Sequence, residues 1–468
     1  MPLRRVLARC SSKDPPGPPG LPLVGVFPVA RKDPLRFFVE SARQYGDIVS
    51  MRFGLRRAYL LSHPDHVKHV LQDHHRAYWK SPIAARVRPL FGDSLTTIDG
   101  EGWRRQRQLL RPVFQQSRLM PFVPIVTAAT TAMLDRWQRI AEHGKPLDLQ
   151  REMADLTRAI ILRVLFGDIA AAEGGAVGQA LDLALDHASR GLWGPLGWLE
   201  VPTSGNRQYR CALRTVDGFL SGTIARARRQ GCPPGTLLSL LLHTCGADGN
   251  RRMSDGELHD ELKAFLVAGH TTTASALAWV GYALAVNVRV EQQLKRELRA
   301  VLEGRPPGPE DLPALRYARM LIMEALRLYP PTWITARTPV DDDEIGGYRI
   351  AADAIVLLSP FVTHRHAGFW EDPERFEPER FLPERSAARP RFAYFPFGGG
   401  PRSCIGSGFA SIEMQLVVAM VAQRYHLTLV PGCRVDLDPG LTLRPRPGVP
   451  VHPHQEAPSH RHFGRWSF

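Results

Sequence analysis

"FPFGGGPRSCIGSGFASIEMQL", from Phe395 to Leu416, is the most informative segment of this chain. Glycines and a proline come first, then Cys404, and then the pattern of a helix. The thiolate is the form of cysteine that ligates metals. Glycines let backbone N–H groups approach the sulfur, and the N-terminus of the following helix favours negative charge there. The segment therefore predicts a site that holds a buried thiolate.

Other interpretations of this glycine-rich loop fit less well. A phosphate-binding P-loop requires a Lys-Ser/Thr pair after its glycines, and "GGGPRS" lacks that pair. A dinucleotide-binding fingerprint also fails, because Gly398 and Gly400 have no third glycine at the required spacing. A plain buried cysteine would not need such a loop.

A second informative segment, "FLVAGHTTTAS" (Phe265–Ser275), lies inside a long apolar pattern. Ser254 and Glu257 have the spacing of a capping box. We therefore expect a helix that begins there and extends to Asn287, roughly 50 Å at 1.5 Å per residue. Gly and Thr are poor helix formers, so local structure does not explain them here. One face of the helix carries Leu258, Leu262, Phe265, Gly269, Thr272 and Ala276.

The loop before Cys404 resembles the heme-binding signature F-x-x-G-x-R-x-C-x-G of the cytochrome P450 family, the heme-thiolate monooxygenases. The matching residues are Phe397, Gly400, Arg402, Cys404 and Gly406. Four more segments fit in the family's order: "GWRRQR" with its W-x-x-x-R pair, "AGHTTT" at the oxygen-activation motif, "EALR" with its E-x-x-R pair, and "FWEDPERFEPERF". The resemblance covers nearly the whole chain.

The resemblance implies that the protein binds heme b (iron protoporphyrin IX), with Cys404 as the axial ligand of the iron. A thiolate ligand pushes electron density onto the iron and favours O–O cleavage. Phe397 would pack beside the sulfur and limit water. Arginine suits a buried carboxylate because it donates through a fork, although Arg337, in "ITARTP", is explained equally well as a surface residue. The residues implied to hold the two heme propionates are Trp103, Arg107, Arg337 and Arg402.

Three further residues are expected to be structural. Glu324 and Arg327 would form the family's buried pair, and Arg380 would join them as a third partner. The alternative is an ordinary helical ion pair on a solvated face. His364, in "THRHAGFW", is expected to make hydrogen bonds rather than bind a metal, because Cys404 fills that role.

The "AGHTTT" motif is expected to form the distal wall above the heme. Gly269 would leave room for O2, because it has no side chain. Thr272 aligns with the family's proton-delivery threonine. The family usually has an acid directly before that threonine, and this chain has Thr271, which does not titrate near neutral pH. Either Thr271, His270 or water carries the protons, or proton delivery is impaired. We favour ordinary monooxygenation, because a water chain substitutes for a side chain.

The substrate pocket is predicted from position alone. The loop "YWKSPIAARVRPLFGDSLTTI" would cover the heme from one side, and "WGPLGWLEVPTSG", with Trp193 and Trp198, would form the access lip. Apolar and aromatic linings favour a hydrophobic substrate, such as a terpenoid, polyketide, fatty acid or aromatic compound. The same residues are alternatively core. The predicted lining residues are Trp333 and Ile334, in "PTWITA", together with Phe265 and Ala268.

The fold class expected is mainly α with minor β (α+β), the cytochrome P450 fold, with a long central helix over the heme and a small β-rich region. "IVSMRFGLRRAYLLS" predicts two strands around a glycine turn, and "HLTLVPGCRVDLDPGLTLRPRP" predicts a strand-rich tail. Residues 1–25 are expected to form a proline-rich N-terminal lead-in. Residues 26–468 would form a single heme-thiolate catalytic domain.

Composition and charge narrow the function classes. The 468 residues contain 60 Lys and Arg against 46 Asp and Glu, a net charge of +14. That charge is spread along the chain, so we expect no nucleic acid partner. The six cysteines form no C-x-x-C pair, which favours a reducing compartment. No apolar run reaches the ~18 residues of a membrane span, and the basic start lacks a signal-peptide core. We therefore expect a cytoplasmic protein without a transmembrane segment.

The resulting hypothesis is a monooxygenase that activates O2 to hydroxylate or epoxidise a hydrophobic small molecule. The sequence shows no flavin or nicotinamide domain, so electrons would come from a ferredoxin or flavodoxin with its NAD(P)H reductase. A positive balance suits an acidic partner of this kind. Two alternatives remain open: a peroxide-using or atypical P450 oxidase, and a non-catalytic heme-thiolate sensor.

Overall fold

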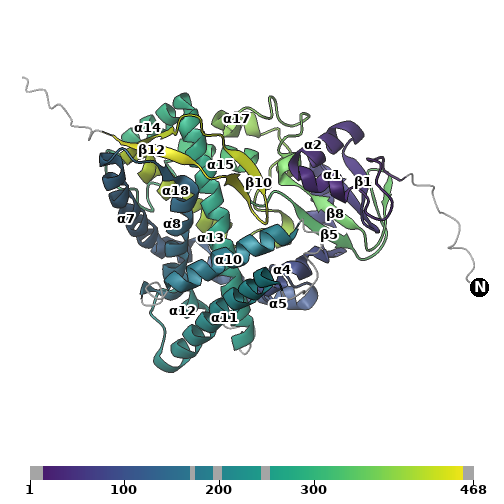
Figure 1. The fold of residues 1–468 in the computed structure, drawn as a ribbon, viewed down its shortest axis with the longest axis horizontal. Helices are drawn as coiled ribbons and strands as arrows, with labels where there is room; N and C mark the ends of the chain where they lie inside the picture. Colours follow the sequence, from purple (N-terminus) through teal and green to yellow (C-terminus); the bar gives the residue numbers. More distant parts are fainter. Residues whose placement is uncertain (1–13, 169–173, 193–202, 244–252, 457–468) are drawn as a thin grey trace, which may run out of the picture.

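The structure of the protein is a computed structural model that describes residues 14–168, 174–192, 203–243 and 253–456. Trp193 and Trp198, expected at the access lip, lie outside the described residues. Helices make up most of the described chain and pack around one large hydrophobic core (Figure 1). The longer helices are α2 (Pro34–Tyr45), α4 (Ile83–Phe91), α5 (Gly100–Leu110), α7 (Val123–Glu142), α8 (Leu149–Phe166), α10 (Gly174–Leu192), α11 (Ser204–Gln230), α12 (Leu237–His243), α13 (Asp255–Val286), α14 (Val288–Leu302), α15 (Arg316–Leu328) and α18 (Ser407–Arg424).

Helix α13 runs through the middle of this helical body (Figure 1). The capping box predicted at its start is present: Ser254 Oγ accepts from the Glu257 N–H, and the Glu257 carboxylate accepts from the Ser254 N–H. The helix packs closely on α8 because it carries glycine where the two helices approach. A Cβ on Gly281 would lie 2.7 Å from Leu149 Cδ1. The predicted long central helix is therefore confirmed.

A five-stranded sheet lies at one end of the molecule, beside α1 (Phe27–Lys32) and α2 (Figure 1). Its strand order is β1-β2-β8-β5-β3, with β2 parallel to β8 and the other pairs antiparallel. The predicted pair around a glycine turn is β1 and β2. The strands of this sheet are β1 (Ile48–Phe53), β2 (Arg56–Leu61), β3 (Tyr78–Lys80), β5 (Thr335–Pro339) and β8 (Ile355–Leu358).

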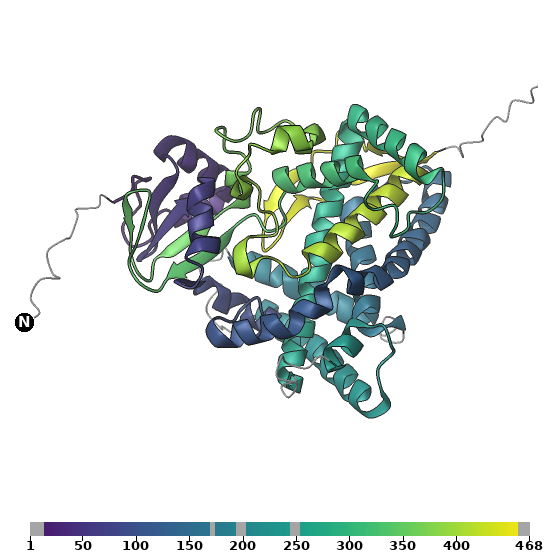
Figure 2. The ribbon, with the colours of Figure 1, turned by 180° about the vertical axis from the view of Figure 1, so that it is seen from behind.

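The remaining strands form small sheets, and three of them (Tyr425–Leu429, Asp436–Pro439 and Leu443–Arg446) fall in the strand-rich tail that the sequence predicts. Their orders are β4-β12-β9, β10-β11 and β6-β7. Helix α18, which follows Cys404, crosses the helical body beside α7 and α13, as the view from behind shows (Figure 2). The strands are β4 (Leu147–Asp148), β6 (Asp343–Ile345), β7 (Tyr348–Ile350), β9 (Tyr425–Leu429), β10 (Asp436–Pro439), β11 (Leu443–Arg446) and β12 (Pro450–Gln455).

Short helical turns connect these elements and shape the loops around the central helix. Two of them matter below: the π-helical turn η1 and the 3₁₀ turn η6, which precedes Cys404. These turns are α3 (Pro64–Lys68), η1 (His69–Asp73), η2 (Arg111–Phe114), α6 (Gln116–Leu119), η3 (Met120–Phe122), α16 (Pro360–Thr363), η4 (Pro378–Phe381), α17 (Pro383–Ser386), η5 (Arg391–Ala393) and η6 (Gly400–Arg402).

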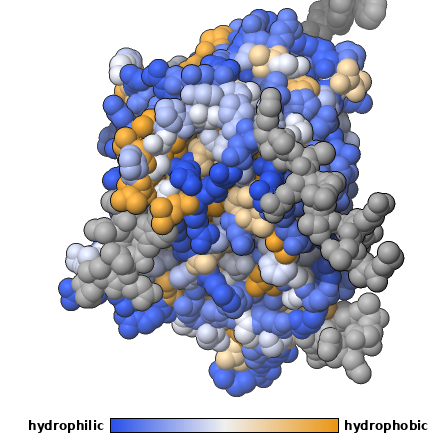
Figure 3. Space-filling view, turned by 90° about the vertical axis from the view of Figure 1, so that its right-hand side faces the viewer, coloured by the Kyte–Doolittle hydropathy of each residue, from blue (hydrophilic) through white to orange (hydrophobic). Residues whose placement is uncertain are grey.

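The described part of the proline-rich segment joins the five-stranded sheet. The Ser50 N–H donates to the Pro16 carbonyl at 2.8 Å, and the Gly54 N–H donates to the Val24 carbonyl at 3.1 Å. Figure 3 looks onto this end of the molecule, where apolar atoms gather in one area of a mostly hydrophilic surface. The exposed large apolar side chains of the segment, of α1 and of the β1–β2 turn are Leu21, Leu23, Val24, Val29 and Leu55.

One helical stretch among the described residues, Gln116–Glu142, is long and apolar enough to cross a membrane by length and composition. It includes α7, whose buried face packs against α8 and α18. Core helices of globular proteins meet the same criterion, so the stretch is weak evidence for a membrane span.

Candidate active site

An interior cavity of about 380 Å³ lies between α13 and the loop that carries Cys404. Ala268 is exposed although its neighbours along α13 are mostly buried, because it lines this cavity. The wall of the cavity is largely apolar. Apolar side chains from five segments of the chain contribute to it, among them Leu95, Phe114, Ile161, Val164, Leu237, Phe265 and Ala268.

Cys404 lines the cavity in the loop between η6 and α18, as the sequence predicts for a ligand. Its backbone N–H donates to the Phe397 carbonyl at 2.9 Å, and Phe397 lines the cavity beside it. Burial raises the pKa of the Cys404 thiol, whereas the backbone N–H groups of Gly406 and Ser407 and the charge of Arg107 act to lower it. The N–H groups expected around the sulfur are therefore present, and a bound metal ion would hold the sulfur as a thiolate.

The loop before Cys404 needs glycine at position 400. Gly400 has a φ of +64°, a conformation that L side chains rarely adopt. A Cβ there would also lie 1.9 Å from the carbonyl oxygen of Leu71 in η1. The signature glycine thus lets η1 pack directly against the cysteine loop.

All four residues expected at the heme propionates line one cavity: Trp103, Arg107, Arg337 and Arg402. Arg337 is only 9% exposed, so it is not the surface arginine of the alternative. Arg402 lies 4.3 Å above the ring of Trp103 and 2.5 Å from a carboxylate oxygen of Asp99. Its Nε is buried without a hydrogen-bond partner among the described residues.

Lys80 also lines this part of the cavity, and sequence reasoning missed it as a cofactor residue. It pairs with Arg337 across β3 and β5. Burial, together with the charges of Arg337 and Arg402, lowers the pKa of Lys80 to about 7. Burial, with the charge of Arg402, likewise lowers the pKa of Arg337 to about 10. The role of Lys80 beside the cofactor can be recognised only from its strand pairing with Arg337, because the local sequence "YWK" does not indicate a binding residue.

The predicted distal residues differ in what they face. Phe265, Ala268, Gly269 and Thr272 line the cavity, whereas Thr271 is not among its lining residues. Thr272 Oγ1 donates to the Ala268 carbonyl at 2.7 Å, and Thr271 Oγ1 donates to the Val267 carbonyl at 3.3 Å.

Gly269 faces a packing constraint as well as the cavity. A Cβ at Gly269 would lie 2.8 Å from Ile161 Cδ1 on α8. The sequence interpretation assigned the missing side chain to O2 alone. In the structure, close packing between α13 and α8 also requires a small residue there.

His270, one of the three proton carriers considered, is turned toward α8 and α10. It is 1% exposed, and its Nδ1 lies 3.3 Å from Thr157 Oγ1. Its Nε2 lies 3.1 Å from Asp182 Oδ1, and the Asp182 side chain is 49% exposed. These contacts connect His270 to the surface, and His270 is not among the residues that line the cavity.

Glu261 is a second cavity residue that sequence reasoning missed. It is buried, its Oε1 accepts the Leu95 N–H at 2.8 Å, and its Oε2 has no hydrogen-bond partner among the described residues. Burial raises the pKa of Glu261 to about 8. Glu261 lies four residues before Phe265 and eight before Gly269, which places all three on one face of the helix. This spacing could have identified Glu261 as a cavity residue from the sequence.

Trp333 and Ile334 lie elsewhere than expected, and neither lines the cavity. Trp333 is 2% exposed, packs 6.3 Å from the ring of Phe38, and donates its indole N–H to the Gly440 carbonyl at 3.0 Å. Trp333 belongs to a separate core cluster beside α2 and the five-stranded sheet, and the half-buried Ile334 packs against that cluster. Their neighbours Thr332 and Thr335 face the cavity instead. The alternative, that these apolar residues are core, therefore describes this pair.

The predicted structural triad is brought together. Arg327 donates to both carboxylate oxygens of Glu324 at 2.7 and 2.8 Å, and both side chains are 0% exposed. Arg380 Nε lies 3.5 Å from Glu324 Oε1. Arg327 also donates to the carbonyls of His364 and Pro373, so the pair is hydrogen-bonded rather than merely buried.

His364 makes hydrogen bonds, as expected, and is fully buried. Its Nε2 accepts the Phe395 N–H at 2.9 Å, and its Nδ1 lies 3.2 Å from the Arg327 carbonyl, to which it donates. Burial lowers the pKa of His364 well below its ordinary value, so the ring is neutral. It ties the end of α15 to the start of the cysteine loop.

The cavity residues fit a thiolate-ligated heme. A cysteine thiol faces the cavity, and the cationic side chains of Lys80, Arg337 and Arg402 gather at one edge, where Asp99 pairs with Arg402. Like charges placed opposite each other on a sheet are destabilising, and two propionates would neutralise them. The fold and the site together thus define the class of heme-thiolate enzymes.

Comparisons with known proteins agree with this class. The Cytochrome P450 family model matches residues 15–450. The chain is 37% identical to cyclooctat-9-en-7-ol 5-monooxygenase of Streptomyces melanosporofaciens over 417 residues, which cover 89% of this chain and 90% of that protein. It is 32% identical to pentalenene oxygenase of Streptomyces avermitilis over 420 residues, 89% of this chain and 92% of that protein. The solved heme domain of cytochrome P450DA superposes with a TM-score of 0.87 at 26% identity, covering 95% of this chain and 98% of that one.

This chain belongs to the cytochrome P450 family. It is a cytochrome P450 monooxygenase whose cofactor is heme ligated by a cysteine thiolate. Its reaction requires O2, a hydrophobic substrate and a source of electrons.

Proposed function

We propose that this enzyme oxygenates a terpenoid, with Cys404 as the heme ligand and with electrons from a separate ferredoxin or flavodoxin. The observation that carries the substrate class is the apolar wall of the cavity, in which Phe114 and Phe265 meet edge to face at 5.1 Å. A hydrocarbon skeleton offers few polar groups, so binding by such a wall depends on shape and buried area. The relatives named for cyclooctat-9-en-7-ol and for pentalenene support the same class.

The chain's own residues would bind, orient and protect the substrate. Bound heme supplies the oxygen chemistry, and a thiolate ligand favours O–O cleavage. The side chains of Phe265, Phe114 and Ile161 would hold the substrate against Ala268 and exclude water from the reacting carbon. Lys80, Arg337 and Arg402 would fix the cofactor through its propionates.

Thr272 is the proposed proton-delivery group. Its hydroxyl donates to the Ala268 carbonyl, so its lone pairs are free to accept a hydrogen bond from water in the cavity. Thr271 and His270 face other groups, and we therefore propose that ordered water, rather than either side chain, brings protons to Thr272.

The proposed electron donor is acidic. The chain carries a net charge of +14, and complementary charge accelerates the encounter of two proteins. We also propose that the enzyme works in the cytoplasm. The described cysteines Cys211, Cys232, Cys404 and Cys433 form no disulfide with one another, as a reducing compartment favours.

Spectral titration tests the substrate class. Cyclic terpene hydrocarbons and alcohols, fatty acids and polycyclic aromatics are added separately to the purified heme-loaded protein. We expect terpenoids to shift the heme toward high spin, and turnover with a surrogate ferredoxin and reductase to add one oxygen atom. A shift with fatty acids or aromatics alone would overturn the terpenoid proposal. Spectral shifts without any product would instead support a heme-thiolate sensor.

A peroxide-driven reaction is the second candidate, and Thr271 is the observation that favours it. The residue before Thr272 does not titrate near neutral pH, so proton supply from the chain is limited. Hydrogen peroxide brings both its protons and its oxidising equivalents. Product formed faster with peroxide than with the ferredoxin system would favour this candidate over the first.

A further inference from the structure

Two histidine rings are brought together by an unusual turn whose other side packs against the loop before Cys404. Residues His69–Asp73 form the π-helical turn η1, and the His74 N–H donates to the His69 carbonyl at 2.8 Å, five residues back. The rings of His69 and His74 stack with centroids 3.9 Å apart and planes 19° from parallel. An ordinary α-helical turn would not superpose residues five apart. Single π-turns are rare and are often found at functional sites.

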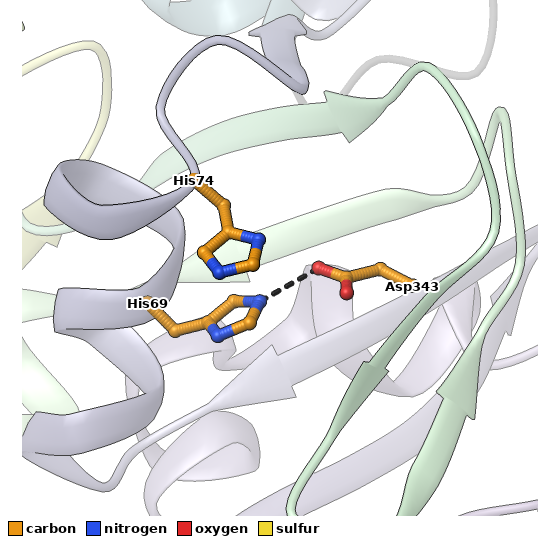
Figure 4. A group of neighbouring side chains, drawn as sticks. All are labelled: His69, His74 and Asp343. Atoms are coloured by element: carbon orange, nitrogen blue, oxygen red, sulfur yellow. Dashed lines mark hydrogen bonds and ion pairs between the residues drawn. The ribbon is translucent and has the colours of Figure 1, made fainter.

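A carboxylate from a distant part of the chain completes the cluster. Asp343 begins β6, and its Oδ2 lies 2.7 Å from His69 Nε2 (Figure 4). One ring nitrogen of each histidine and one oxygen of Asp343 all lie within 4.8 Å of one another. His69 and Asp343 are 23% and 20% exposed, whereas His74 is exposed.

The Asp343 carboxylate is itself held in place. The Tyr78 hydroxyl donates to Oδ2 at 2.5 Å, and the Glu344 N–H donates to Oδ1 at 2.8 Å. Metal-ligating carboxylates are typically oriented by such outer hydrogen bonds. A simple His–Asp hydrogen bond accounts for His69 and Asp343. It does not account for His74, whose exposed ring stacks on His69.

We propose that His69, His74 and Asp343 form a binding site for a divalent transition-metal ion of the zinc class. Imidazole nitrogen and carboxylate oxygen are ligands that Zn²⁺ accepts, and three protein ligands leave one tetrahedral position for water. The exposed His74 faces solvent and gives the ion its entry path. Zinc-bound atoms lie about 3.3 Å apart in a tetrahedral site with bonds of about 2.0–2.1 Å. Seating the ion therefore requires His69 Nε2 and Asp343 Oδ2, now 2.7 Å apart, to separate by roughly half an ångström, while His74 swings in.

A metal ion at this site would affect the packing of η1 against the cysteine loop, because the site lies on η1. Turn η1 packs against η6, and the Leu71 carbonyl occupies the space beside Gly400 that a Cβ would fill. Leu71 also lines the heme cavity. An ion that ties η1 to β6 would hold this turn against the cysteine loop. Zinc should therefore stabilise the heme-loaded protein, independently of which substrate the enzyme oxidises.

Calorimetric titration of the untagged, heme-loaded, metal-free protein with ZnCl₂ tests the site. The informative variant is His74→Ala, because an exposed side chain can be removed without disturbing the core. The matched control is His75→Ala, the neighbouring histidine, whose Nδ1 lies 2.9 Å from the Gln72 carbonyl instead. Surface histidines and thiols elsewhere bind zinc equally in all three proteins, so the comparison isolates this cluster.

We expect the wild type and His75→Ala to bind one more zinc ion per chain than His74→Ala. We also expect zinc to raise the melting temperature of the first two proteins and to raise that of His74→Ala clearly less. Asp343→Asn should weaken the same binding event by at least tenfold. Equal stoichiometry and equal thermal shifts in the wild type and His74→Ala would overturn the proposal. So would displacement of the zinc by an equal concentration of Mg²⁺, which prefers oxygen ligands.

Discussion

Lys80 and Arg337 face each other across the antiparallel pair of β3 and β5, two cations in one recess of the heme cavity. Such opposed like charges are destabilising on a sheet surface, and burial makes them costlier. The pKa of Lys80 is lowered to about 7 because burial and the neighbouring cations disfavour its charged form. The heme propionates would add negative charge to this recess. The pair of cations therefore destabilises the heme-free chain but strengthens binding of the cofactor.

Lys80→Met therefore has opposite effects on the two forms of the protein. We expect the heme-free variant to melt at a higher temperature than the heme-free wild type, because the repulsion with Arg337 is gone. We expect the heme-loaded variant to lose heme roughly 10- to 100-fold faster, since one charge-assisted hydrogen bond is worth about 1.5–3 kcal/mol. Transfer of heme to excess apomyoglobin measures the rate, and exposed Lys145→Met is the control. Unchanged heme loss would remove Lys80 from the cofactor site.

Glu261→Gln should change how stability depends on pH. Burial raises the pKa of Glu261 from 4.5 to about 8, so the folded protein holds this proton more tightly than the unfolded chain. Its contribution to stability is fully present below pH 4.5 and is lost as the pH rises to about 8. The slope reaches about 1.4 kcal/mol per pH unit between those limits. Glutamine keeps the acceptor for the Leu95 N–H and removes the titration.

Thermal melting of the heme-loaded protein from about pH 5 to pH 8 measures this effect. The wild type should lose more stability across the range than Glu261→Gln. Glu257→Gln, on the same helix, is the control: its pairing with Arg105 lowers the pKa of Glu257 to about 2, so Glu257 is ionised throughout. A wild type and a Glu261→Gln variant with parallel pH profiles would contradict the raised pKa.

Much of this site was predictable because its signals are local in sequence. The capping box at Ser254 fixes the start of the central helix, and the glycines before Cys404 fix its loop. Glu324 and Arg327 are three residues apart on one helix, so their pairing follows from spacing. Each of these features depends on neighbours within a few residues, which the sequence displays directly.

Two of the features that sequence reasoning missed, Lys80 and Asp343, depend on contacts between distant segments. Lys80 matters because β3 pairs with β5, and Asp343 meets His69 only after the chain has folded. Trp333 was assigned to the cavity from its position in "PTWITA", but the chain turns its ring into the core beside Phe38. Which way one side chain points in an irregular segment is set by the surrounding packing, which local patterns do not encode.

Glu324→Ala should be the most damaging substitution in the triad. It leaves Arg327 and Arg380 buried without their carboxylate, and breaking a buried pair in this way costs about 3–5 kcal/mol. We expect little or no heme-loaded protein at 37 °C and a large fall in melting temperature at lower growth temperatures. Exposed Glu384→Ala should behave like the wild type. Normal yield and stability of Glu324→Ala would show that the network contributes little.

The rate of electron transfer to the heme should fall as the salt concentration rises, because we propose that opposite charge speeds the encounter with the electron donor. Exposed charges are screened beyond about 8–10 Å at physiological ionic strength. The rate of reduction by an acidic ferredoxin should therefore fall several-fold between low salt and about 0.5 M, whereas reduction by a small uncharged flavin semiquinone should not. A salt-independent rate with the ferredoxin would contradict steering by the positive charge.

Thr271→Glu tests whether proton supply limits this enzyme. Thr271 Oγ1 donates to the Val267 carbonyl and does not titrate near neutral pH, and the proposed donor to Thr272 is water alone. A carboxyl group at position 271 would add a titratable site one residue from Thr272. We expect the fraction of NAD(P)H electrons recovered in product to rise, with less peroxide released. Thr271→Gln matches the size of glutamate without its proton, so it should leave coupling at or below the wild-type value. If Thr271→Glu lowers coupling while Thr271→Gln does not, the added charge disrupts a water chain that already delivers protons efficiently.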